Sequence, residues 1–250
     1  MRRQMNLISR ASLLPRISWH AGLVAKRAMG SEKDPITFDC IPEDRFCEVI
    51  EHLRKNFFCD EPLNSAVGLC PVPGAPHAEL EKMSLSTMKQ GLSVMALMGE
   101  SPGRVVGVAL NGVTRPGDLE VAERQLALSP DPKFRSIFSL LNEANRKLSL
   151  YERYNVDSIF ELRIVSVDSS TRGRGLAQQL LKKSEEVARN NGYHLLKADT
   201  TGKYSQRMAA QGGLETVYTV MYDSYKDSEG KVIFNTSPPH DSLKIMVKKL

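Results

Sequence analysis

The 250-residue sequence is poor in the features that build disulfide frameworks, metal sites and membrane helices. Its four cysteines are Cys40, Cys47, Cys59 and Cys70. None forms a C-x-x-C pair and no histidine stands at a zinc-like spacing from them, so we expect no metal site. No secretory signal is visible, which favours free thiols in a reducing compartment and leaves disulfides as the alternative. No apolar run approaches the ~20 residues of a membrane helix, so we expect no membrane partner.

An excess of positive charge occurs only near the start of the chain. The net charge of the whole chain is +5. Residues 1–30 contain no acid and six basic residues, namely Arg2, Arg3, Arg10, Arg16, Lys26 and Arg27. Because these six charges exceed the net charge of the whole chain, the remainder is close to neutral. Such a body has no net attraction for phosphate backbones, so we predict no nucleic-acid partner.

Residues 1–34 form a basic leader, which we separate from the rest of the chain. Its acid-free first part interleaves arginines with apolar residues and Trp19, a composition typical of mitochondrial transit peptides. A disordered tail, or an alternative start at Met29, explains the same composition. We therefore expect a cytoplasmic protein, with a mitochondrial protein as the alternative. Residues 35–250 are long enough to bury a core as one domain.

Hydrophobic periodicity divides the body into helices and strands. From Pro42 to Phe57 apolar residues recur at helical spacing, and Pro62 places Glu61 at a break. Further helices are expected at residues 77–90, 133–150, 175–190 and 205–211, and strands at 92–98, 104–110, 158–167, 193–198, 216–222 and 243–247. We expect a polar connection over residues 116–132. This order predicts an α+β domain in which helices pack on a mixed central sheet.

One segment carries a recognisable chemistry, the run Arg172-Gly173-Arg174-Gly175-Leu176-Ala177. It follows an apolar strand and begins an amphipathic helix. Glycines let the backbone turn sharply, and the free N–H groups of a first helical turn attract anions. The two arginines add charge-assisted donors, so the run favours a pyrophosphate. An ordinary helix cap with basic flanks is the alternative interpretation.

Better-known phosphate loops do not fit this run. A P-loop requires Lys followed by Ser or Thr directly after its last glycine, whereas Leu176 and Ala177 follow Gly175 here. A Rossmann loop requires a third glycine where Gln178 stands. The spacing Arg-x-x-Gly-x-Ala instead resembles the acetyl-CoA loop of the GNAT superfamily of acyltransferases.

Four segments in order resemble one family within that superfamily, the insect-type arylalkylamine N-acetyltransferases. Residues 57–64, FFCDEPLN, resemble its F-x-D-E-P-L-N segment, and residues 164–177 its S-V-D…R-G-x-G-I-A segment. Residues 204–208, YSQRM, are similar to Y-S-A-R, and residues 237–240, SPPH, to a closing A-P-H. The resemblance implies the GNAT fold, in which two strands of the central sheet splay apart around acetyl-CoA.

The resemblance also implies the reaction and its residues. Acetyl would pass directly from acetyl-CoA to an arylalkylamine, with Glu61 as general base and the hydroxyls of Thr201 and Ser205 assisting. His240 would line the amine site. Phe58, which adjoins Glu61 in the chain, is our own candidate for a ring that faces the substrate. The coenzyme would contact Val165, Ser166, Val167, Arg172, Gly173, Arg174, Gly175, Leu176, Ala177 and Gln178. For Thr201 helix capping is the alternative, and for His240 a capping or surface role.

The acceptor and the assembly state are less specified. A polyamine, a fatty amine or a protein N-terminus would use the same chemistry, and a silent acyl-CoA-binding protein is the alternative outside enzymes. A catalytically inactive acyl-CoA-binding protein would be expected to lack the general base. Glu61 is present, which favours an enzyme. We expect a monomer whose only partners are the amine and acetyl-CoA.

Overall fold

The computed structural model describes residues 34–250, and the leader expectations for residues 1–33 lie outside this part. Residues Asp34–Leu250 form one compact unit. Its centre is a seven-stranded sheet in the order β1-β2-β3-β4-β5-β7-β6. The strands are β1 (Ile36–Cys40), β2 (Val94–Met98), β3 (Arg104–Thr114), β4 (Ile159–Val167), β5 (Leu195–Thr200), β6 (Glu215–Met221) and β7 (Ser242–Lys249). All neighbours are antiparallel except β4 and β5, so the sheet is mixed, as predicted.

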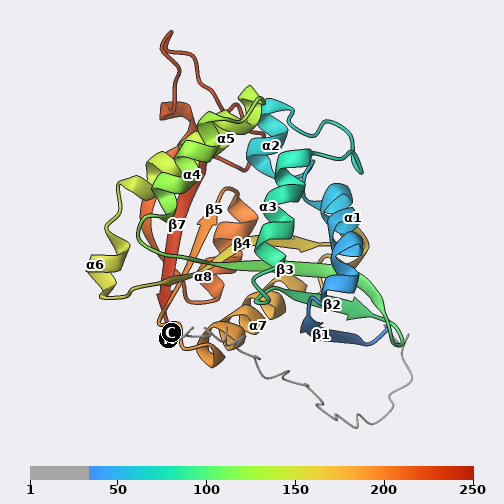
Figure 1. Cartoon of the computed structure of the whole chain (residues 1–250). Helices are drawn as coiled ribbons and strands as arrows, with labels where there is room; N and C mark the ends of the chain where they lie inside the picture. The colour runs from blue at the N-terminus through green and yellow to red at the C-terminus, as the bar shows by residue number, and fades with distance from the viewer. Residues whose placement is uncertain (1–33) are drawn as a thin grey trace, which may run out of the picture. The chain divides into compact units, whose positions relative to one another are not determined.

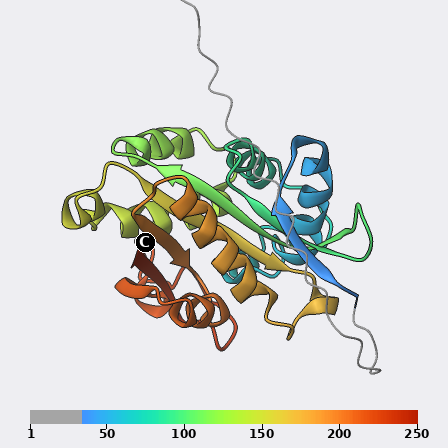
Figure 2. The ribbon, with the colours of Figure 1, turned by 90° about the horizontal axis from the view of Figure 1, so that it is seen from below.

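Helices cover both faces of this sheet (Figures 1 and 2). One face carries α1 (Phe46–Asn56), α2 (Pro62–Val67), α3 (Ala78–Met88) and α5 (Pro132–Arg146), whose apolar side chains share one core with β3. The other face carries α7 (Leu176–Asn190) and α8 (Lys203–Gln211), which share a second core with β4 and β5. The remaining elements are α4 (Asp118–Ala127), α6 (Leu150–Tyr154) and the short 3-10 turns η1 (Glu43–Arg45), η2 (Ser169–Thr171) and η3 (Tyr222–Ser224).

The strongest helical stripes of the sequence become the helices that line the cores. In α1, Val49 and Leu53 have no exposed surface, and in α7 the same holds for Leu180. Asp131 caps α5 by accepting hydrogen bonds from the N–H groups of Lys133 and Phe134. Periodicity therefore predicted these helices because one face of each is buried.

The expectation of a polar connection over residues 116–132 is wrong, because α4 lies within it. None of the α4 residues is buried, and the helix packs mainly against α5. A helix that buries no complete side chain leaves little apolar periodicity for a sequence to show. Strand β1 was not predicted either, since it is a short edge strand that pairs only with β2.

The splayed strand pair is present in the middle of the sheet. Strands β4 and β5 pair only where residues 160–162 face residues 196–198. Beyond Leu162 and Ala198 both strands continue, to Val167 and Thr200, without pairing to each other. Backbone groups on the facing edges are therefore available to a ligand that enters between the strands.

Candidate functional site

Glu61 lies at the predicted break between two helices. Helix α1 ends at Asn56, and Pro62 begins α2, a position where the missing N–H of proline costs nothing. Glu61 is the N-cap of α2, and its Oε2 accepts a hydrogen bond of 2.7 Å from the N–H of Asn64. The cap fixes the carboxylate at the start of the helix, where the helix dipole favours negative charge.

The second oxygen of this carboxylate contacts a residue 140 positions away in the chain. The Thr201 hydroxyl donates to Glu61 Oε1 at 2.6 Å. The carbonyl of Thr201 in turn accepts a hydrogen bond of 2.6 Å from the buried Tyr222 hydroxyl. Gly202, not Thr201, is the N-cap of α8, so the capping alternative for Thr201 is wrong. The structure thus brings together the two residues predicted to act as base and hydroxyl.

Burial changes the acidity of Glu61. Loss of solvent raises the pKa of its carboxyl, and hydrogen bonds from Thr201 and from backbone N–H groups oppose this rise only in part. All of these donors are neutral. Burial likewise raises the pKa of Tyr222, which keeps its hydroxyl protonated as a donor. A carboxylate with a raised pKa is suited to accept a proton near neutral pH.

Ser205 and His240 lie at the same corner, at the start of α8. The Ser205 hydroxyl donates to the carbonyl of Gly202 at 2.8 Å, and His240 Nδ1 accepts from the N–H of Lys203 at 3.1 Å. A Cβ on Gly202 would lie 2.8 Å from His240 Nδ1 and 2.9 Å from Pro62 Cγ. Glycine is therefore needed here because the segments of Pro62 and His240 approach closely. In this structure both side chains cap α8.

Phe58 does not face a ligand, and the expectation that it presents a ring to the substrate is wrong. Its exposed fraction is 0%, and it lies in the core between the sheet and α1. Sequence reasoning placed it by its distance from Glu61 along the chain, which says nothing about direction. Tyr222 was missed as a partner of Thr201, because no local pattern links two residues that meet only through the sheet. Tyr204, in contrast, is exposed beside His240, with ring centroids 5.4 Å apart.

The predicted pyrophosphate loop has the backbone of an anion site. Gly173 and Gly175 have φ angles of 79° and 73°, in the left-handed region that favours glycine. A Cβ on either would meet nothing within 4 Å, so the requirement for glycine is conformational. Gly175 is the N-cap of α7 and supplies no side-chain cap. The first N–H groups of α7 are thus left to donate hydrogen bonds to an anion.

The side chains of the loop contact neighbouring segments. Arg172 forms an ion pair of 2.8 Å with Asp60, the residue before Glu61. Arg174 donates to the carbonyl of Asp34 at 3.3 Å. Leu176 is buried in the second core, so only its backbone is available to a ligand. Gln178 donates to the carbonyl of Met208 at 2.8 Å and joins α7 to α8.

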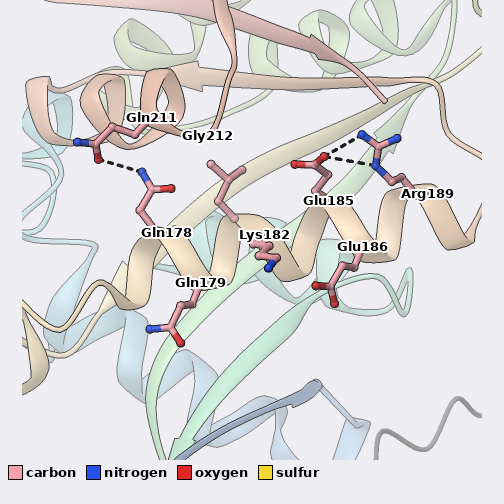
Figure 3. Close-up of a pocket in the computed structure, with 9 residues that line it drawn as sticks. Gln178, Gln179, Lys182, Glu185, Glu186, Arg189, Gln211 and Gly212 are labelled. Atoms are coloured by element: carbon pink, nitrogen blue, oxygen red, sulfur yellow. Dashed lines mark hydrogen bonds and ion pairs between the residues drawn. The ribbon is translucent and has the colours of Figure 1, made fainter. Parts of the chain in front are cut away.

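A surface pocket of about 480 Å³ lies beside Gln178 (Figure 3). It follows α7 to the Glu185–Arg189 ion pair and reaches Gln211 and Gly212 at the end of α8. Neither Glu61 nor Thr201 lines it. Among residues 34–250, no group of three or more His, Cys, Asp or Glu side chains is placed to hold a metal ion, and no helix is long and apolar enough to cross a membrane.

Comparison with known proteins identifies the class. Residues 70–212 match the Acetyltransferase (GNAT) family. The crystal structure of arylalkylamine N-acetyltransferase 2 from Aedes aegypti has a TM-score of 0.82 and 46% identity, over 86% of this chain and 98% of that one. The chain therefore belongs to the GNAT acetyltransferase family, and the predicted fold class and resemblance to arylalkylamine N-acetyltransferases are confirmed.

More distant relatives share the fold. A mosquito arylalkylamine N-acetyltransferase like 5b has a TM-score of 0.78 and 24% identity, over 86% of this chain and all (100%) of that one. The polyamine N-acetyltransferase of Drosophila melanogaster has a TM-score of 0.76 and 24% identity, over 86% and 100%. At 24% identity these two comparisons show a shared fold, and they do not indicate which amine this chain acetylates.

Proposed function

We propose that the protein transfers the acetyl group of acetyl-CoA to the primary amine of an arylalkylamine, such as dopamine, tyramine, octopamine, serotonin or tryptamine. The observation that carries the proposal is the partly buried Glu61 carboxylate, hydrogen-bonded to Thr201, in a chain 46% identical to an arylalkylamine N-acetyltransferase. Glu61 is the general base in this proposal.

The residues on both sides of the strand gap fit acetyl-CoA. The uncapped start of α7 with its two left-handed glycines suits a diphosphate, and Arg172 supplies positive charge. The unpaired edge of β4 at Val165, Ser166 and Val167 offers backbone groups to the amides of the coenzyme arm. When bound, acetyl-CoA supplies an activated thioester carbonyl.

The residues of the chain move protons and orient the amine. A free alkylamine has a pKa near that of lysine, about 10.4, so it arrives protonated and must lose a proton before it attacks. Glu61 accepts this proton through a bridging water, and Thr201 holds its Oε1 in place. As the new C–N bond forms and the C–S bond breaks, the nitrogen loses its second proton and the departing thiolate gains one. The Ser205 hydroxyl delivers its proton to the thiolate and regains one from the nitrogen. His240 lines the amine site beside it.

The acceptor class is tested by CoA release with a panel of amines. The proposal predicts kcat/KM values for dopamine, tyramine and tryptamine at least about tenfold above those for agmatine, spermidine and a peptide N-terminus, or ~1.4 kcal/mol of discrimination. A preference for agmatine or spermidine would instead identify the protein as a polyamine N-acetyltransferase. If no amine causes CoA release, the alternative of a catalytically inactive acyl-CoA-binding protein is favoured.

The coenzyme site is tested by a matched pair of glycine variants. Gly175→Ala strains a left-handed position in the loop, and Gly230→Ala strains one with a φ angle of 81° in a turn before β7. Each costs about 1–2 kcal/mol of backbone strain. Only Gly175→Ala should raise the KM for acetyl-CoA. Equal KM values in the two variants would mean that the loop does not bind the coenzyme.

The compartment and assembly state complete the proposal. We propose a monomer in the cytoplasm, with mitochondrial import through the leader as the alternative. Gel filtration and the N-terminal sequence of the native protein test these two points.

A further inference from the structure

A row of polar side chains joins the segment that carries Glu61 to the segment that carries the coenzyme loop. The row consists of His52 and Asn56 on α1 and of Asp60, which follows the helix. The three are spaced by four residues, and we call them the polar row. His52 Nε2 lies 3.0 Å from Ser166 Oγ, Asn56 Oδ1 accepts the Ser169 N–H at 3.3 Å, and Asp60 pairs with Arg172 at 2.8 Å. The three partners, residues 166, 169 and 172, are spaced by three.

The first contact of the row is completely internal. His52 and Ser166 are 6% and 3% exposed, so neither side chain has water as a ready substitute partner. Burial lowers the pKa of His52 to about 4, against the opposing effect of Asp168, so the ring is neutral at neutral pH. Removal of one partner therefore leaves the other polar group buried without a hydrogen bond. His52 therefore fixes α1 on the last residues of β4.

The second contact acts in two directions. The Asn56 amide nitrogen donates to the carbonyl of His52 at 3.1 Å, which closes the last turn of α1. Its oxygen accepts the N–H of Ser169, at the start of the turn η2 that leads to Arg172. Asn56 is also the last residue of α1, five positions before Glu61. One side chain thus ties the end of α1 to the beginning of the loop.

We propose that His52 and Asn56 are positioning residues, which hold the Glu61 carboxylate in register with the β4 strand and loop that take acetyl-CoA. The inference rests on the proposed function. Thr201 fixes Glu61 from the side of β5, and the polar row fixes its segment from the side of β4. Glu61 is therefore held from both edges of the strand gap. A displacement of 1 Å between a base and its reacting atoms can cost about 10²-fold in rate.

Variants of His52 test the proposal on the full chain. His52→Leu removes the contact, whereas the amide nitrogen of His52→Gln reaches about as far as the histidine Nε2. We expect His52→Leu to lower kcat about tenfold or more, with the Kd for CoA within about threefold of the parent value. His52→Gln should restore most of the loss. His77→Leu is the control, since His77 also bonds through its ring, to Asp131 and the N–H of Leu80, outside the row.

A second readout does not depend on turnover. CoA should slow the hydrogen exchange of backbone amides in residues 57–64 of the parent protein, and His52→Leu should abolish this effect. Asn56→Ala should weaken it, and Asn56→Asp, which keeps the acceptor for Ser169, should weaken it less.

The outcomes separate the inference from the proposed function. An unchanged kcat and retained CoA protection in His52→Leu would overturn the positioning role, as would the same kcat loss in His77→Leu or a failure of His52→Gln to restore it. A parent protein that shows CoA protection and its loss in His52→Leu, but acetylates no amine, would refute the proposed function and keep the positioning role. A parent without CoA binding would overturn both.

Discussion

Two partly buried glutamates, Glu61 beside the β4–β5 pair and Glu161 within β4, have pKa values that are shifted in opposite directions. Burial acts to raise the pKa of both carboxyls. At Glu161 the cations Lys197 and Arg163 outweigh this effect, with contacts of 2.6 Å and 2.9 Å, and its pKa lies well below the usual range. At Glu61 the partners are a hydroxyl and N–H groups, and the pKa is raised. The partner, and not the degree of burial, thus decides in which direction the pKa of a partly buried carboxyl is shifted.

The two glutamates also belong to opposite ends of the strand pair. Glu161 faces Lys197 in the part where β4 and β5 are paired. Lys197 also donates to Asn145 on α5 at 2.6 Å and lies 3.1 Å from Asp199. Glu61 contacts Thr201, just beyond the end of β5, where the pairing has ceased. Charged side chains therefore join the strands at the paired end, and the proposed base lies at the unpaired end.

The largest effect is expected from breaking the paired end. Lys197→Met leaves Glu161 and Asp199 buried without their shared cation and should lower the free energy of unfolding by about 3–5 kcal/mol. Urea unfolding measures it. Lys55→Met, which removes an exposed pair with Glu51 at 3.8 Å, is the control and should change stability by less than about 1 kcal/mol. Equal losses in the two variants would mean that the buried network does not hold the strands together.

Removing the proposed base at the unpaired end should lower the catalytic rate and leave the free energy of unfolding nearly unchanged. Glu61→Gln keeps the size of the side chain and loses the proton acceptor, so kcat/KM should fall about 10²-fold or more. The Kd for CoA should stay near the parent value. Glu81→Gln removes a carboxylate that pairs with Arg54 and provides the control in the CoA-release assay. Parent-like activity in Glu61→Gln would assign the base elsewhere.

The pH dependence sharpens the contrast between the glutamates. Glu61 must be ionised to accept a proton, and its pKa is raised above the ordinary value of 4.5. Activity should therefore fall, as the pH is lowered, at a pH above 4.5, while Glu161 stays ionised there. The acid limb of the kcat/KM profile, which reports groups of the free enzyme, measures this, and it should be absent from the residual activity of Glu61→Gln. An acid limb at or below 4.5 would contradict a buried base.

The smallest effect concerns Phe58, which neighbours Glu61 in the chain and belongs to the core. Phe58→Leu should lower the free energy of unfolding by about 1–2 kcal/mol through lost packing and leave the KM for the amine unchanged. Tyr204→Leu, at an exposed ring, should change stability by less than about 0.5 kcal/mol. A raised KM for the amine in Phe58→Leu, without loss of stability, would mean that the Phe58 ring contacts the substrate after all.

Local patterns predicted the parts of the fold whose faces are buried. The stripes of α1, α5 and α7, the β2–β3 hairpin and the break at Glu61 all appear where the periodicity and Pro62 place them. Strand β1 and helix α4 were missed because one is a short edge strand and the other buries no residue completely. The pairing of Glu161 with Lys197 and the hydroxyl of Tyr222 at Thr201 had no local signal at all.

The sequence by itself determined the loop of residues 172–177, because left-handed glycines and an uncapped helix start are properties of consecutive residues. A family resemblance named Glu61 and Thr201, but their meeting at 2.6 Å depends on the sheet that brings residues 140 positions apart together. Tertiary structure also decided that Phe58 points into the core and that Glu161 is neutralised by Lys197. Side-chain direction, burial and the charge of the partner arise only when distant segments pack, and these three properties distinguish the proposed base Glu61 from the ion-paired Glu161.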